Sequence, residues 1–214
     1  MEHDITAVCI SRQVEPWNIP EVPFVCFVDN WKPFGHEKSR DRVNYLAERR
    51  NQAVARALSL FPSTQHILMI DSYYVNQPDP VRVLLNEYDG NCILGGAVWF
   101  LDKTRVNPRI RFWDSWTTPE LANLEYLPQM AGKVSVKAVG ACYLYPKGAW
   151  QKIGYGVPND LHGCEHNYLC EMSGFGVYLT LKVKLWRSAV VYGWPKRIRQ
   201  TIHLGRLRRN TNYP

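Results

Sequence analysis

The fold is decided by residues 67–71, ILMID, where four apolar residues lead directly into a carboxylate at Asp71. A short, continuous apolar run is typical of a strand that is buried on both faces. Residues 50–58, RNQAVARAL, have the spacing of a helix and precede this strand across a break at residues 61–65. A helix that feeds a buried strand is half of a βαβ unit, so the sequence predicts an α/β fold. Asp71 should then stand at the sheet edge where open α/β sheets bind their ligands.

Two more strands are predicted upstream of this unit. Residues 5–12 are β-branched and almost continuously apolar, as expected of a central strand. Residues 22–29 predict a second strand, which also ends in a carboxylate, Asp29. The helix before Asp71 should extend over residues 40–60. Because parallel strands end at one edge of a sheet, Asp29 and Asp71 should lie at the same edge.

The second half of the chain is predicted to close the domain. Residues 134–145 have strand character, and residues 164–173 predict a helix that ends at Gly174. We expect residues 1–190 to form one catalytic domain and residues 191–214 to form a basic C-terminal tail.

Composition and charge limit the class of protein. The chain has 214 residues, of which 46% are hydrophobic, so it can bury a full core. Its polar, acidic start and the lack of a long apolar run predict a cytoplasmic protein. The net charge is +7, and no acidic residue follows Glu171. Such a basic segment can clamp a pyrophosphate, contact an anionic membrane peripherally, bind nucleic acid, or be a solvated tail.

The helix with Arg50-Asn51 that leads to Asp71-Ser72-Tyr73 resembles the GT-A glycosyltransferases, and in particular those of the family 2 type. In that family the strand ends in Asp-x-Asp, which holds a nucleotide sugar and its metal. Here Tyr73 stands in place of the second Asp. The resemblance implies a Rossmann-type three-layer α/β/α sandwich with a mostly parallel central sheet. It also implies a hexosyltransferase that moves a sugar from a UDP- or GDP-sugar to a glycan, glycoprotein or lipid acceptor, with inversion at the sugar carbon.

The resemblance also implies roles for individual residues. Glu165 would be the catalytic base, because a sugar hydroxyl is a weak nucleophile, and His166 would orient or replace it. Trp113 and Trp116, in an irregular segment rich in tryptophan and proline, would stack on the acceptor. The nucleotide sugar would be bound by Arg12, Asp29, Arg50, Asn51, Asp71, Ser72 and Gly140.

The implied cofactor is Mn²⁺ or Mg²⁺, which oxygen ligands favour over zinc. Its ligands would be Asp71 with help from Asn76, Asp79 or, from the C-terminal segment, His203. Since Tyr73 replaces the usual ligand, a second solution is that lysines and arginines of the basic segment stabilise the departing diphosphate without metal.

Two other classes remain open. Nucleotidyltransferases place an acidic residue at the end of a similar strand, but residues 11–16 contain no glycine for their usual basic loop. A non-catalytic module could instead bind nucleic acid or a membrane surface through residues 196–209, with a steep dependence on salt. Nucleic acid is not an expected partner of the transferase.

Overall fold

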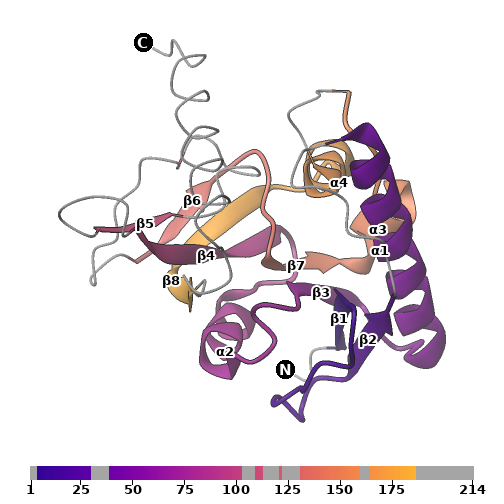
Figure 1. The fold of residues 1–214 in the computed structure, drawn as a ribbon, viewed down its shortest axis with the longest axis horizontal. Coiled ribbons are helices and arrows are strands. Elements are labelled where there is room, and N and C mark those ends of the chain that lie inside the picture. Colours follow the sequence, from indigo (N-terminus) through magenta and orange to yellow (C-terminus); the bar gives the residue numbers. More distant parts are fainter. Residues whose placement is uncertain are drawn as a thin grey trace.

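The computed structural model describes residues 4–29, 39–102, 109–112, 121, 131–159 and 164–186, and it shows an α/β fold (Figure 1). The helices are α1 (Arg40–Leu60), α2 (Pro78–Glu87), α3 (Lys147–Ile153) and α4 (Glu165–Ser173). The strands are β1 (Ile5–Ser11), β2 (Phe24–Val28), β3 (His66–Asp71), β4 (Ile93–Asp102), β5 (Arg109–Phe112), β6 (Lys133–Ser135), β7 (Cys142–Pro146) and β8 (Val177–Trp186).

All the strands belong to one mixed sheet. Its order is β2-β1-β3-β7-β4-β8-β6, with β5 paired to β4 beside this path. The pairs β1–β2, β1–β3 and β4–β8 are parallel, whereas β3–β7, β4–β7, β4–β5 and β6–β8 are antiparallel. The prediction of a mostly parallel sheet was therefore wrong. An apolar run such as β7 shows that a strand is buried, but its periodicity says nothing about the direction in which it pairs.

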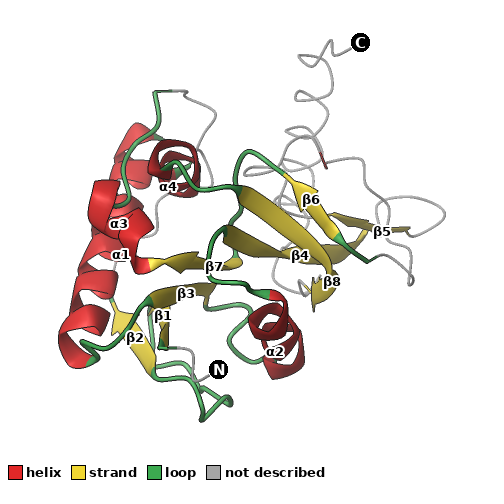
Figure 2. Ribbon diagram, turned by 180° about the vertical axis from the view of Figure 1, so that it is seen from behind, coloured by secondary structure: helices red, strands yellow, loops and turns green. Residues whose placement is uncertain are grey.

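Helices cover both faces of the sheet. Helices α1, α3 and α4 lie on one face and α2 lies on the other (Figure 2). Their buried side chains belong to two separate hydrophobic cores. The strand β3 shows the alternation that this requires, because Ile67 and Met69 belong to the first core and Leu68 and Ile70 to the second. The continuous apolar run that opened the sequence is thus explained by burial on two sides.

The boundaries of α1 and α4 follow local signals. α1 begins after Ser39, whose side chain accepts a hydrogen bond from the backbone N–H of Arg42, and it spans the predicted residues 40–60. α4 ends, as predicted, at Gly174, whose φ of 80° lies in the left-handed region that glycine tolerates.

The predicted single strand at residues 134–145 was wrong, because β6 and β7 are separate strands. The chain leaves the sheet between them and turns at Ala141, whose φ is 59°. Among the described helices, none combines the length and the apolar character that a bilayer-spanning helix needs. The proposed basic tail, residues 191–214, lies outside the described residues.

Candidate functional site

The parallel strands β1, β2 and β3 end at the same edge of the sheet, and a carboxylate lies at the end of β2 and of β3. Asp71 is the last residue of β3 and pairs in register with Ile10 of β1. Asp29 follows β2, and its backbone N–H donates to the carbonyl oxygen of Ser11 at 2.9 Å. Asp29 and Asp71 therefore lie at one edge, as the sequence predicted.

Arg50 on α1 connects Asp71 to the start of α4. Its Nη2 donates to Oδ1 of Asp71 and its Nε donates to Oε1 of Glu165, both at 3.0 Å. The side chains of Arg50 and Glu165 are only 7% and 3% exposed, whereas that of Asp71 is 34% exposed. Burial alone would lower the pKa of Arg50, but the charges of Asp71 and Glu165 outweigh burial and raise this pKa well above its usual value. One fixed guanidinium thus serves two carboxylates, of which only Asp71 is open to solvent.

Glu165 and His166 form the first turn of α4, where a carboxylate is favoured by the helix dipole. The turn is held by Asn167, whose side-chain oxygen accepts from the backbone N–H of Cys164 at 2.9 Å. His166 is buried, and its Nε2 lies 3.1 Å from Nη2 of Arg50. Burial, and then the charge of Arg50, lower the pKa of His166 well below its usual value, while the charge of Asp71 opposes them. His166 is therefore neutral at pH 7, and it cannot supply a positive charge to a ligand.

Arg49 makes a second link from α1 to the sheet edge. Its Nε lies 3.0 Å from Oδ2 of Asp29, and the hydroxyl of Tyr45 donates to the same carboxylate oxygen. The guanidinium of Arg49 also lies 4.8 Å from the ring centre of Tyr45. Neither residue was among the predicted site residues. Their separation by four positions on a helix, which places them on one face, was the signal that could have identified them.

Asn51, the predicted partner of the nucleotide, is used within the fold. Its Oδ1 accepts from the indole N–H of Trp150 at 2.9 Å and from the backbone N–H of Tyr155 at 2.8 Å, and its Nδ2 donates to the carbonyl oxygen of Tyr155. These bonds fasten α1 to α3 and to the segment after it. Asn51 thus helps to hold the scaffold on which Arg50 is mounted.

Three more predicted residues lie near the edge. Gly140 is buried beside Ala141, whose carbonyl oxygen accepts from the backbone N–H of Asp71 at 2.7 Å. Ser72 directly follows Asp71 in a turn, and Arg12 is exposed just beyond the end of β1. The structure thus brings Arg50, Asp71, Glu165 and His166 into direct contact, with Gly140 and Ser72 adjacent. Trp113, Trp116 and His203 lie outside the described residues.

Among the described residues at this edge, Asp71 could contribute an oxygen ligand to Mn²⁺ or Mg²⁺. Asp71 offers a carboxylate at the edge, but its Oδ1 already accepts from Arg50. Within the described ranges, no three His, Cys, Asp or Glu side chains are grouped so that they could hold a metal ion. The edge is suited to hydrogen bonding, because Asp71 is partly exposed and its orientation is set by the buried guanidinium of Arg50.

Comparison with known proteins leaves the chain without an assigned family. No protein-family model matches the sequence, and no curated protein matches it.

Proposed function

We propose that this chain transfers a sugar from a nucleotide-diphosphate donor to a glycan, glycoprotein or lipid acceptor on a GT-A-like sheet. The observation that carries the proposal is Asp71, a partly exposed carboxylate at the end of a parallel strand, held by the buried guanidinium of Arg50. Ligands of open α/β sheets bind outside the carboxyl ends of the strands. A carboxylate whose orientation is set before binding loses little entropy when it accepts a hydrogen bond from a hydroxyl of the donor.

In the proposed reaction the acceptor oxygen forms a bond to the anomeric carbon while the bond from that carbon to the diphosphate breaks. The acceptor hydroxyl must lose its proton in this step, and the departing diphosphate must have its charge stabilised. Inversion is expected because a single displacement attacks the face opposite the leaving group.

Glu165 is the proposed base, and its environment makes a second role testable. As a base it must come within hydrogen-bond distance of the acceptor hydroxyl. In the structure its carboxylate is 3% exposed and accepts from Nε of Arg50. The alternative role is to hold Arg50, and thereby Asp71, in the orientation that binds the donor.

Thermal shift with UDP- and GDP-sugars, each with and without Mn²⁺, tests the donor site, because a ligand that binds only the folded state raises Tm. We expect one donor to raise Tm in the wild type and the shift to be lost in Asp71→Asn. The matched control is Asp41→Asn, which removes the same charge from an exposed side chain in the first turn of α1. An equal shift in Asp71→Asn and the wild type would refute the assignment of Asp71. If no donor raises Tm, the alternative is favoured in which the chain is a non-catalytic module that binds nucleic acid or a membrane surface through residues 196–209.

Glu165→Gln separates the two roles of Glu165. If Glu165 is the base, the variant should keep donor affinity and lose transfer. If it positions Arg50, donor affinity and transfer should fall together, because a neutral amide holds a guanidinium less firmly than a carboxylate does. Donor titration and product formation, measured on the same preparation, decide between them.

A further inference from the structure

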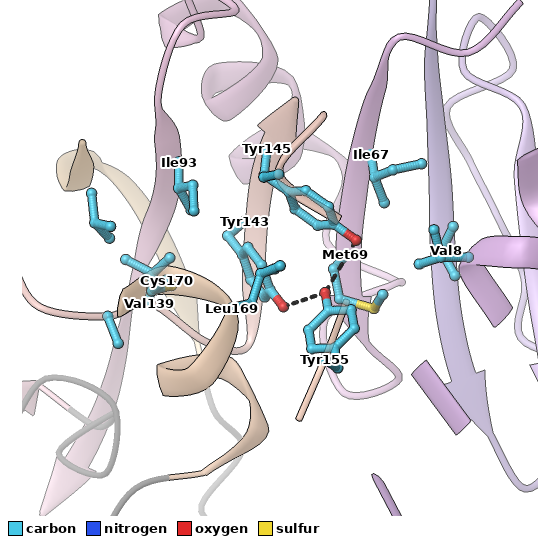
Figure 3. Packing of buried hydrophobic residues seen from close by; sticks show 14 of the residues in the cluster. Val8, Ile67, Met69, Ile93, Val139, Tyr143, Tyr145, Tyr155, Leu169 and Cys170 are labelled. Atoms are coloured by element: carbon cyan, nitrogen blue, oxygen red, sulfur yellow. Dashed lines mark hydrogen bonds between the residues drawn. The ribbon is translucent and has the colours of Figure 1, made fainter. Parts of the chain in front are cut away.

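A chain of buried tyrosine hydroxyls lies directly behind His166. Nδ1 of His166 is 2.8 Å from the hydroxyl of Tyr143, which is 2.6 Å from the hydroxyl of Tyr155. Tyr155 in turn donates to the hydroxyl of Tyr145 at 3.2 Å. Figure 3 shows these three tyrosines in the core, with the two bonds between them drawn as dashed lines. None of the three was identified as a site residue from the sequence.

The position of Arg50 sets the direction of this chain. A guanidinium has only donors, so Nε2 of His166, 3.1 Å from Nη2 of Arg50, must be the acceptor. The imidazole proton then sits on Nδ1 and is donated to Tyr143, Tyr143 donates to Tyr155, and Tyr155 donates to Tyr145. In the opposite tautomer Nε2 of His166 would carry the proton and would point it at the guanidinium, which cannot accept it. A carboxylate oxygen near Nε2, Oε1 of Glu165, is 3.5 Å away, which is long for a hydrogen bond.

The charged and titratable groups around the imidazole agree with this arrangement. They are Arg50 from α1, Asp71 from β3, Tyr143 from β7, Tyr155 after α3, and Glu165 beside it on α4. Burial is the largest cause that raises the pKa of Tyr143 and of Tyr155 well above the usual value, so both hydroxyls keep their protons. Burial and Arg50 lower the pKa of His166, so the imidazole is neutral. Every donor in the chain up to Tyr155 then has an acceptor.

We propose that Tyr143 and Tyr155 are positioning residues, which fix His166 as its Nδ1–H tautomer so that Nε2 accepts from Arg50 and holds the guanidinium between Glu165 and Asp71. Among the described residues, this chain of hydrogen bonds ends at the hydroxyl of Tyr145, which is fully buried. The hydrogen-bond arrangement stands on geometry alone, whereas its consequence for donor affinity rests on the proposed function.

NMR of protein labelled with ¹⁵N-histidine tests the tautomer without any ligand. We expect His166 to be neutral at pH 7, with its proton on Nδ1. Tyr143→Phe leaves Nδ1–H buried without an acceptor, a cost sufficient to shift the tautomer ratio by about tenfold, so the ¹⁵N shifts of His166 should move. Tyr88→Phe is the matched control, because Tyr88 is also buried and its hydroxyl lies 3.1 Å from Nδ1 of another histidine, His66, outside this chain of hydrogen bonds. It should leave the shifts of His166 unchanged.

Two results would overturn the proposal. One is a His166 in the wild type that carries its proton on Nε2 or is charged, and this measurement does not depend on a variant that folds. The other is a His166 signature in Tyr143→Phe equal to that of the wild type.

A second measurement extends the test to donor affinity. If a nucleotide sugar binds, Tyr143→Phe should weaken its binding by about tenfold in Kd, and the control Tyr88→Phe by less than about twofold. In His166→Gln the amide oxygen offers Arg50 an acceptor that needs no tautomer, so adding Tyr143→Phe to this variant should change Kd little. A full tenfold loss in that double variant would contradict the positioning role. If no donor binds, the NMR result still decides the tautomer, so failure of the proposed function is distinguishable from failure of this inference.

Discussion

Arg50→Met should destabilise the protein more than Asp71→Asn, which changes the partly exposed carboxylate that Arg50 holds. The Nε of Arg50 and Oε1 of Glu165 are 3.0 Å apart, and their side chains are 7% and 3% exposed. At that distance, and with an effective dielectric of roughly 20, the attraction is about 5–6 kcal/mol. Removing one partner of a buried pair typically costs about 3–5 kcal/mol, because the other charge stays buried without its counterion. We expect a cost in that range for Arg50→Met, and a fall in Tm of roughly 6–20 °C.

Asp71→Asn is the comparison, because Asp71 lies at the same distance from Arg50 but is 34% exposed. Water screens such a pair, and its loss should cost about 1 kcal/mol. Urea unfolding at pH 7, followed by tryptophan fluorescence, measures both changes. Arg50→Met/Glu165→Met should recover at least half of the loss, because no buried charge then remains unpaired. The reasoning fails if Arg50→Met lowers the free energy of unfolding no more than Asp71→Asn does. It also fails if the double variant loses as much of this free energy as Arg50→Met and Glu165→Met lose when measured separately and added.

Two further predictions concern stability. The pKa of His166 is well below its usual value in the folded protein, whereas in the unfolded chain it is about 6.5. Below that pH the unfolded chain therefore binds a proton at His166 that the folded protein does not bind. The free energy of unfolding should fall by up to about 1.4 kcal/mol per pH unit as pH drops below that value. This contribution should vanish in His166→Gln, so an identical dependence of the free energy of unfolding on pH in the two proteins would contradict it. Gly96→Ala should cost about 1–3 kcal/mol, because the added Cβ would lie 2.5 Å from Cγ1 of Val183. Gly148→Ala, on α3 with nothing within 4 Å, should stabilise by about 0.5–1 kcal/mol; equal effects of the two glycine changes in urea unfolding would refute the packing argument.

The features that local sequence signals predicted are those that local physics determines. The helix at residues 40–60 was predicted from its spacing, and the end of α4 from Gly174. The strand β3 was predicted because its apolar run is short and bounded. The direction of β7 was not predicted, because burial on two faces gives the same pattern in parallel and antiparallel strands. The break between β6 and β7 was missed because the residues between them include buried apolar ones, such as Val139, that pack without pairing.

The candidate site was predicted in part for the same reason. Asp29 and Asp71 were found because strand ends are local features, and their shared edge follows from the parallel pairing of β1 with both neighbours. The contact between Arg50 and Glu165 joins residues 115 positions apart, which no local pattern reveals. Tyr143 and Tyr145 carried one usable signal, because two tyrosines at alternate positions of an apolar strand face the same core and need hydrogen-bond partners there.

The consecutive arginines of α1 have a mechanical consequence. Arg49 forms an ion pair with Asp29 after β2, and Arg50 forms one with Asp71 at the end of β3. These two ties connect the helix to two strand ends at once. Successive residues of a helix are about 100° apart, so the helix cannot rotate without breaking one of the two ties. An insertion of one residue between Tyr45 and Arg50 would therefore disturb the whole edge. An insertion in the turn after Leu60 would leave both ties intact, so tolerance to changes in length should differ sharply between these two neighbouring segments.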